Sequence, residues 1–240
     1  MLKNKVALVT GASSGIGRAI ALVWAREGAK VVVSDVNVQA GEETAALVRA
    51  AGGDAIFVAA DVGKPEDCEA LVQRTVAHYG RLDVACNNAG IGGPQAPTAD
   101  YPLDGWAQVI NINLSGVFYG MKYQIAAMLK NGGGSIINMA SILGSVGFAT
   151  APAYTAAKHG VVGLTKAAAI EYSAHGVRIN AVGPAFIHTP MISGLEQDAG
   201  INAMLVGAHP IGRLGQPEEV AELVTWLASS KASFVTDRKS

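Results

Sequence analysis

A tyrosine and a lysine stand four residues apart in the run AYTAAKHG, at Tyr154 and Lys158. On a helix this spacing places both side chains on one face. A free tyrosine has a pKa near ~10, which is too high for ready proton exchange at neutral pH. An ammonium group one turn away favours the phenolate, so we expect the pKa of Tyr154 to lie below that of a free tyrosine. The pair predicts a proton-transfer site, although a Tyr and a Lys at this spacing often only cover a surface.

The elements that must position this pair alternate between short β-branched runs and longer helical ones. The predicted strands are almost continuously apolar, which is typical of strands covered on both faces, and they span 5–10, 30–35, 54–61, 82–90, 134–141 and 177–184. The predicted helices span 16–27, 38–51, 65–79, 103–130, 153–175 and 217–229. Proline followed by acidic residues marks two helix starts, at Pro65 and Pro217. The alternation predicts an α/β fold, a Rossmann-like doubly wound parallel sheet of six to seven strands with helices on both faces, in three layers.

The composition predicts one domain over residues 1–240. Half of the residues are apolar, 15% are charged and the net charge is -1, which excludes disorder and a field that would recruit nucleic acid or an anionic membrane. Neither a signal peptide nor a membrane span is indicated. Cys68 and Cys86 match no metal spacing, and His159, His175 and His209 show no ligand spacing, so we expect reduced thiols, a cytoplasmic location and no metal.

The run TGASSGIG lies where the first predicted strand meets the first helix. Its glycines, Gly11, Gly15 and Gly17, allow a tight turn and a close approach of backbone to a pyrophosphate at the helix N-terminus. The spacing differs from G-x-G-x-x-G, and without a following Lys-Ser/Thr it is not a Walker loop. A plain strand-to-helix turn is the alternative, but the context of strand and helix favours dinucleotide binding.

Asp35 ends the second predicted strand, close to the expected ~20 residues beyond the glycines. A carboxylate there can accept hydrogen bonds from an adenosine ribose, and it would repel a 2′-phosphate. No Arg or Lys follows in DVNVQAGEE to offset that charge. The sequence therefore predicts NAD as the cofactor in preference to NADP.

Taken together, these motifs resemble the short-chain dehydrogenase/reductase family over about the first 235 residues. The matching runs are TGASSGIG, the Asp-Val pair at residues 61–62, NNAG at 87–90, ININL at 110–114, NMAS ending at residue 141, YTAAK at 154–158 and IGRLGQPEEVAELVTWLAS near the end. Single matches would be weak, whereas this many in order are specific.

The resemblance implies roles for four catalytic residues. Tyr154 is similar to the family's general acid/base, Ser141 to its substrate-orienting partner and Lys158 to the cation that tunes it. Asn113 resembles the fourth member, which helps to hold a water that connects the lysine to solvent. A serine hydroxyl can polarise the substrate carbonyl, and a positive nicotinamide ring adds to the effect of the lysine on the tyrosine.

The same resemblance implies the contacts of the dinucleotide. Asp61 and Val62 would border the adenine, Asn88 and Gly90 the adenosine side, and Ile187 and Thr189 the nicotinamide carboxamide. The full predicted set is Gly11, Ser13, Ser14, Gly15, Ile16, Gly17, Asp35, Asp61, Val62, Asn88, Ala89, Gly90, Tyr154, Lys158, Pro184, Ile187 and Thr189.

Two features depart from the family pattern. Pro184 is followed by Ala185 where the family usually has glycine. After SSKASFVT the family's glycine-rich final strand is replaced by DRKS, so we expect the seventh strand to be short or absent and the assembly to be weakened.

These observations predict an NAD(H)-dependent oxidoreductase that interconverts a secondary alcohol and a ketone. Residues 185–210 are expected to form a mobile flap over the substrate. The apolar run FIHTPMI, with Leu143 and Phe148, favours a small hydrophobic alcohol or ketone. A homotetramer or homodimer is expected, with no nucleic-acid or membrane partner. The alternatives are a 3-oxoacyl-carrier-protein reductase, a non-catalytic dinucleotide-binding protein and a folded but inactive subunit.

Overall fold

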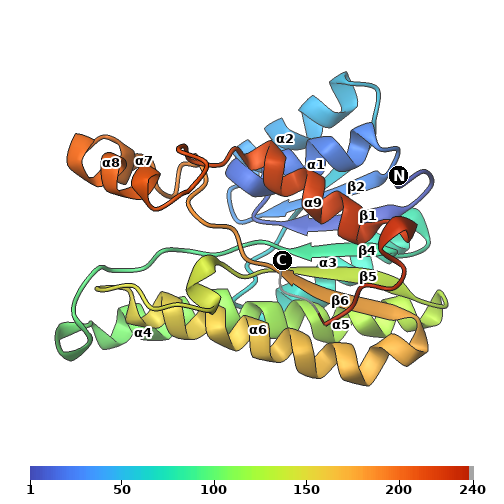
Figure 1. The fold of residues 1–240 in the computed structure, drawn as a ribbon. Coiled ribbons are helices and arrows are strands. Elements are labelled where there is room, and N and C mark those ends of the chain that lie inside the picture. The colour runs from blue at the N-terminus through green and yellow to red at the C-terminus, as the bar shows by residue number, and fades with distance from the viewer. Residues whose placement is uncertain (238–240) are drawn as a thin grey trace.

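The computed structural model describes residues 1–237, which form a parallel sheet with helices on both faces (Figure 1). The strands are β1 (Val6–Thr10), β2 (Lys30–Asp35), β3 (Asp54–Ala59), β4 (Val84–Asn87), β5 (Gly134–Met139) and β6 (Val177–Val182). Their order is β3-β2-β1-β4-β5-β6, with every neighbouring pair parallel. The predicted fold class is confirmed, and the described residues form six strands.

Helices cover each face of the sheet and create two separate apolar cores (Figure 1). One face is covered by α1 (Gly15–Arg26), α2 (Val38–Ala50) and α9 (Pro217–Ala228). The other is covered by α3 (Pro65–Tyr79), α5 (Gly116–Lys130) and α6 (Pro152–Tyr172). Because both faces are buried, β1 and β4 consist of buried residues alone, as the apolar runs in the sequence indicate.

The strand order reverses between β1 and β4, and one residue beyond β4 ties the two strand ends together. The Asn88 side-chain amide donates to the carbonyl oxygens of Thr10 (2.9 Å) and Gly11 (3.1 Å). The Thr10 hydroxyl in turn accepts from the backbone N–H groups of Asn88 and Ala89. Ligands of open α/β sheets bind at such a reversal, outside the carboxyl ends of the strands.

The predicted strands run past the observed ones at this edge of the sheet. The hydrogen-bonded ladders end at Ala59, Asn87, Met139 and Val182, whereas the sequence predicted strand out to residues 61, 90, 141 and 184. The extra residues are small or polar and leave the ladder as loops. They include Asp61, Gly90 and Ser141, all of which the sequence assigns to the site.

The long helix predicted over 103–130 is interrupted. It consists of α4 (Leu103–Ile110), one π-helical turn (Asn111–Ser115) and α5. Asn113 lies inside this turn, and its amide group hydrogen-bonds the backbone of Ile91. A π turn inserts an extra residue into a helix and is frequent at functional sites, and hydrophobic periodicity alone does not reveal it.

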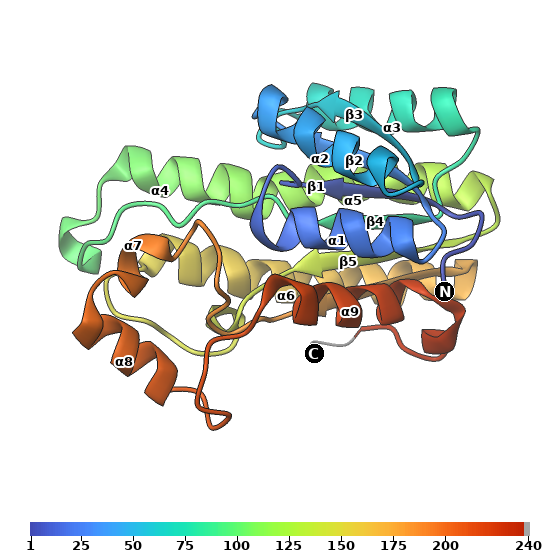
Figure 2. The ribbon, with the colours of Figure 1, turned by 90° about the horizontal axis from the view of Figure 1, so that it is seen from above.

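Residues 185–210 contain two helices that the sequence did not predict, α7 (Ser193–Glu196) and α8 (Ala199–Gly207). Figures 1 and 2 show them beyond the carboxyl end of the sheet, at the same end as α4. Asp198 caps α8 by accepting from the N–H groups of Gly200 and Ile201. This capping residue was the signal that could have revealed α8; the helix is mostly apolar and lacks an amphipathic pattern.

The chain after α9 returns to the free edge of β6. The N–H of Asp237 donates to the carbonyl oxygen of Ile179 (2.9 Å), and the Thr236 hydroxyl accepts from the N–H of Ile179 (3.2 Å). Within residues 1–237 this contact does not extend to a seventh strand, in agreement with the sequence expectation. The last three residues of the DRKS segment lie outside the described residues. Within the part described, no helix is long and apolar enough to cross a bilayer.

Candidate active site

The glycine-rich loop joins β1 to α1 and leaves the start of α1 uncapped by a side chain. Ser14 is the N-cap residue, and its side chain makes no capping hydrogen bond. The first N–H groups of the helix therefore keep their hydrogen-bonding capacity and their partial positive charge for an anion. The residues of the loop also line a cavity, so these N–H groups are accessible to a ligand. The loop therefore fits the pyrophosphate of a dinucleotide.

The glycines of this loop are required by close backbone contacts. Gly11 has φ +63°, and a Cβ on it would lie 2.7 Å from the Cα of Ala89. A Cβ on Gly17 would collide with the carbonyl oxygen of Gly11 and approach the side-chain nitrogen of Asn88 to 2.6 Å. The loop thus packs against the end of β4 with no room for a side chain.

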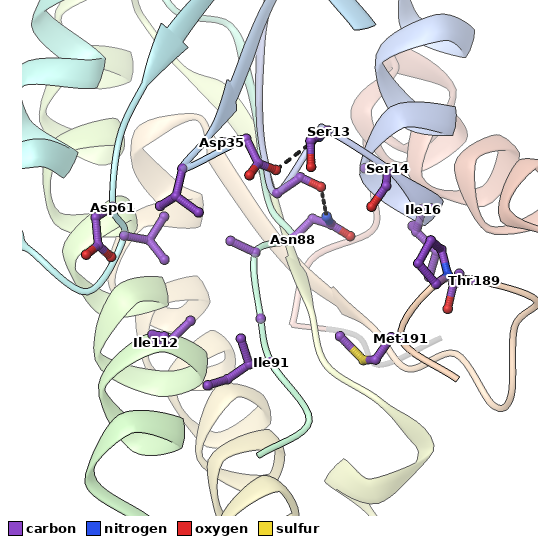
Figure 3. Close-up of a pocket in the computed structure, with 18 of the residues that line it drawn as sticks. Ser13, Ser14, Ile16, Asp35, Asp61, Asn88, Ile91, Ile112, Thr189 and Met191 are labelled. Atoms are coloured by element: carbon purple, nitrogen blue, oxygen red, sulfur yellow. Dashed lines mark hydrogen bonds between the residues drawn. The ribbon is translucent and has the colours of Figure 1, made fainter. Parts of the chain in front are cut away.

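A first cavity of about 320 Å³ opens along this loop (Figure 3). It brings together most of the predicted cofactor contacts, which come from the ends of β1, β2, β3 and β4 and from the segment after β6. These are Gly11, Ser13, Ser14, Gly15, Ile16, Gly17, Asp35, Asp61, Val62, Asn88, Ala89, Gly90 and Thr189. The sequence missed Val36, Ala60, Ile91, Ile112, Pro190 and Met191, because small and apolar residues carry no signal that separates lining from core.

Asp35 has a structural task in addition to lining the cavity. Its carboxylate accepts a hydrogen bond from the N–H of Ser13 (3.0 Å) and another from the N–H of Asn37 (2.9 Å). The first of these bonds fixes the glycine loop to the end of β2, as Figure 3 shows. A carboxylate has about four lone-pair sites, so the group retains capacity for ribose hydroxyls.

A second cavity of about 280 Å³ adjoins the first, since Ile16, Asn88, Gly90, Thr189 and Met191 line both. Its polar end holds the predicted residues Ser141, Tyr154 and Lys158, and Pro184 and Ile187 also line it. Its remaining lining is largely apolar and includes Ile142, Leu143, Phe148, Phe186, Ile192 and Leu195. Sequence reasoning anticipated the apolar character through Leu143, Phe148 and residues 186–192, and it missed Gln95, Ala151 and Leu195.

Ser141 is oriented toward Tyr154 by the short helical turn that it caps. Its hydroxyl oxygen accepts from the N–H of Leu143 (3.2 Å), and Ser141 and Tyr154 line the same cavity. Burial raises the pKa of Tyr154, and the neighbouring Ser141 hydroxyl lowers it to a smaller extent. For the chain by itself, the expectation of a tyrosine pKa below the usual value is therefore wrong, because desolvation outweighs the effect of the neighbouring groups.

Lys158 lies beneath Tyr154 and is only 3% exposed. Its ammonium nitrogen is 5.4 Å from the centre of the Tyr154 ring and donates to the carbonyl oxygen of Met139 (2.7 Å). Burial lowers the pKa of Lys158 to about 8. The predicted tyrosine–lysine pair is thus assembled on α6, and the cation it contains is held at a desolvation cost.

Asn113 does not line either cavity and is fully buried behind them. Its amide oxygen accepts from the N–H of Ile91 (2.9 Å), and its amide nitrogen donates to the Ile91 carbonyl (2.8 Å). A Cβ on Gly90 would lie 3.2 Å from the Asn113 amide oxygen and 3.8 Å from the Lys158 nitrogen. Asn113 and Lys158 therefore lie next to each other beside Gly90.

The chain is similar in sequence and in structure to known dehydrogenases. The profile of a family described as "Enoyl-(Acyl carrier protein) reductase" matches residues 11–239. A cyclohexanol dehydrogenase of Acinetobacter sp. is 50% identical over 97% of this chain and 91% of the relative. A 2,5-dichloro-2,5-cyclohexadiene-1,4-diol dehydrogenase of Sphingobium indicum is 46% identical over 98% of this chain and 94% of the relative. Among solved structures, an NAD+-bound xylitol dehydrogenase matches with a TM-score of 0.95 and 32% identity, over 99% of this chain and 97% of that one.

The packing around Gly17 predicts that Gly17→Ala weakens dinucleotide binding at least about tenfold, because the added methyl group must push the loop from the end of β4. Gly163→Ala is the matched control, since a Cβ there meets nothing within 4 Å and alanine suits the interior of α6. Titration with NADH, followed by its fluorescence, measures both variants. Unchanged binding by Gly17→Ala would contradict the close packing.

The buried cation predicts a pH-dependent stability. The pKa of Lys158 is about 8 in the folded chain and near 10.5 when unfolded, so between these values the unfolded chain binds more protons. We expect the free energy of unfolding of the native chain to rise from pH 8 to pH 10 relative to that of Lys158→Met. Urea unfolding without dinucleotide measures this difference, with the exposed Lys166→Met as control. A difference that stays constant with pH would refute the prediction.

Proposed function

The chain belongs to the short-chain dehydrogenase/reductase family, and on that premise we propose that it interconverts a small cyclic secondary alcohol and the matching ketone with NAD(H). The single observation that carries the proposal is the position of the Ser141–Tyr154 pair. These hydroxyls lie in the second cavity, beside the residues that both cavities share. A substrate oxygen bound there can reach a proton donor and a hydride donor at once.

The four predicted residues have distinct tasks in this proposal. When bound, a nicotinamide dinucleotide supplies or accepts the hydride and, in its oxidised form, adds a positive charge to the site. Tyr154 takes the hydroxyl proton during alcohol oxidation and returns it during ketone reduction. Ser141 donates to the substrate oxygen and polarises the carbonyl. Lys158 favours the phenolate form of Tyr154, and Asn113 holds the backbone of Ile91 in place through two hydrogen bonds.

The preference for NAD(H) rests on Asp35. Its carboxylate lines the first cavity, and its neighbour Val36 is an exposed apolar side chain that offers no charge to a 2′-phosphate. A phosphate there would meet like charge. The relative solved with NAD+ supports the same choice.

A small cyclic substrate is supported by the size and lining of the second cavity. At about 280 Å³ it lies near the lower end of the range for ligand pockets, roughly 300 Å³ and above. Apolar side chains surround the polar end, which suits a hydrocarbon ring that carries one reacting hydroxyl. The names of the two relatives quoted above, each a dehydrogenase of a six-membered ring, point the same way.

We further propose that residues 1–240 act as one domain in which residues 185–210 form the substrate flap. The flap contributes Phe186, Thr189 and Met191 to the cavities, and α8 buries only Leu205. A homotetramer or homodimer is supported by the exposed apolar side chains of Leu103 and Phe118 on α4 and α5. A cytoplasmic location is supported by the two cysteines, which are buried and unpaired.

The role of Tyr154 predicts that Tyr154→Phe lowers kcat for NAD+-dependent oxidation of cyclohexanol by at least about 100-fold, since the proton acceptor is lost. Affinity for NADH should stay within about threefold, because the phenol only borders the cofactor cavity. Tyr172→Phe, on the same helix, is the matched control and should retain full activity. The measurement is NADH formation by absorbance over a panel of cyclic and acyclic secondary alcohols.

Each alternative has its own outcome in this panel. Activity that survives Tyr154→Phe overturns the mechanism. Turnover only with NADPH and an acyl-carrier substrate favours the acyl-carrier-protein reductase, in line with the description of the matching family profile. Dinucleotide binding without any turnover favours a binding protein or an inactive subunit.

The position of Asp35 predicts that Asp35→Ala combined with Val36→Arg lowers the ratio of kcat/KM for NAD+ over NADP+ at least about tenfold. Because Asp35 also anchors Ser13, Asp35→Asn is a control that keeps an acceptor oxygen at this place and removes the charge. Val36→Arg alone separates the effect of the added cation. An unchanged ratio in the double variant would sink the assignment of NAD.

A further inference from the structure

The apolar side of the second cavity is bounded by two aromatic rings that reach it from different segments. Phe148 follows the short turn after Ser141, and Phe186 follows β6. Their ring centroids are 6.2 Å apart with an interplanar angle of 63°, an edge-to-face arrangement. Both rings line the cavity that holds Tyr154.

A third ring, that of His209, packs against Phe186, and it is absent from the lining of the cavity. The centroids of His209 and Phe186 are 5.8 Å apart at 73°, again edge to face. We call Phe148, Phe186 and His209 the aromatic stack. His209 does not line the cavity, and its ring contact with the cavity lining is through Phe186.

Hydrogen bonds fix both the orientation and the tautomer of His209. Its Nε2 accepts from the backbone N–H of Phe186 (3.2 Å), so this nitrogen carries no proton. Its Nδ1 is 2.7 Å from the carbonyl oxygen of Leu205 and therefore donates to it. The ring thus connects the backbone of Phe186 to the last turn of α8.

The two residues bonded to His209, Leu205 and Phe186, belong to two separate parts of the chain, α8 and the segment after β6. Leu205 is 2% exposed and is the buried residue of α8. On the other side, the carbonyl oxygen of Phe186 accepts from the N–H of Gly215, and His188 donates to the Gly215 carbonyl. Gly215 therefore fixes the Phe186 carbonyl, and His209 fixes its N–H and its ring.

We propose that His209 is a specificity-determining positioning residue, which holds Phe186 against Phe148 so that the aromatic stack presents a rigid apolar surface to the substrate ring. The proposal deepens the proposed function and rests on it for the class of substrate. A rigid pair of rings matches the fixed shape of a six-membered carbocycle. A flexible acyclic alcohol gains less from it, because it must be ordered on binding.

The test is a double-mutant cycle between His209 and Phe186. His209→Phe keeps a ring in the stack and removes both hydrogen bonds of His209, the one from the Phe186 N–H and the one to the Leu205 carbonyl. We expect KM for cyclohexanol to rise about fivefold, roughly the effect of the one hydrogen bond that positions Phe186, with kcat and KM for NAD+ within about twofold. KM for 2-hexanol should change less, so the preference for the cyclic alcohol falls.

The cycle separates an effect through Phe186 from a general structural one. In a Phe186→Ala background, His209→Phe should leave the cyclic-to-acyclic preference unchanged, because the ring it positions is gone. His209→Gln places an acceptor oxygen near the position of Nε2 and should restore part of the preference. His175→Phe, an exposed histidine beyond α6, is the matched control. Additive effects, or equal losses for both alcohols together with NAD+, would overturn the proposal.

A crystal structure of His209→Phe makes the test independent of turnover. If no alcohol of the panel is oxidised, the proposed function fails, and the position of Phe186 in this structure still decides the inference. If only acyclic alcohols are oxidised, the proposed substrate class fails, and the cycle is run on those. A Phe186 ring displaced from Phe148 supports the role of His209, whereas an unmoved ring refutes it.

Discussion

The hydrogen bonds between Thr10 and Asn88 are the constraint on which the rest of the site depends. They join the ends of β1 and β4, the two strands between which the sheet order reverses. Because these ends are held together, the glycine loop packs directly on the segment after β4, with Gly17 against Gly11 and Asn88. The first cavity forms along this junction, and the second continues it toward β5 and β6. A looser junction would separate the first cavity from the second.

At the polar end of the second cavity, burial shifts the pKa values of Tyr154 and Lys158 more than neighbouring charges do. Tyr154 and Lys158 are both shielded from solvent. Desolvation raises the pKa of the tyrosine and lowers that of the lysine, so it favours the neutral form of each. The lysine remains in place because the Met139 carbonyl accepts from it, and α6 provides the scaffold for both residues. In the chain alone, burial therefore disfavours both the Tyr154 phenolate and the Lys158 ammonium, and an additional positive charge nearby would favour the phenolate. In the proposed function the oxidised cofactor contributes that charge.

The substrate side is built differently from the cofactor side. Most residues of the first cavity come from strand ends, which the sheet holds at one edge, and Thr189, Pro190 and Met191 join them from the segment after β6. The apolar lining comes instead from the turn after Ser141 and from residues 185–210, whose attachments are local, such as the bonds of Phe186 to Gly215 and His209. Segments that are held by a few local contacts can vary in sequence without disturbing the sheet. This division explains how one scaffold can keep its cofactor site while its substrate cavity changes.

The sequence by itself determined the alternation of strands and helices, the glycine loop, the placement of Asp35 and the Tyr154–Lys158 spacing, because each depends on local periodicity or on residues close in the chain. Tertiary structure alone decided three further features. These are the π turn that buries Asn113, the connection of α8 to Phe186 through His209, and the direction in which the Tyr154 pKa moves. Each depends on contacts between segments that are distant in the chain: Asn113 with Ile91, His209 with Phe186, and Tyr154 with the surrounding groups that exclude water. Spacing along the chain records which side chains can meet, but their burial and their fixed orientation arise only when the segments pack together.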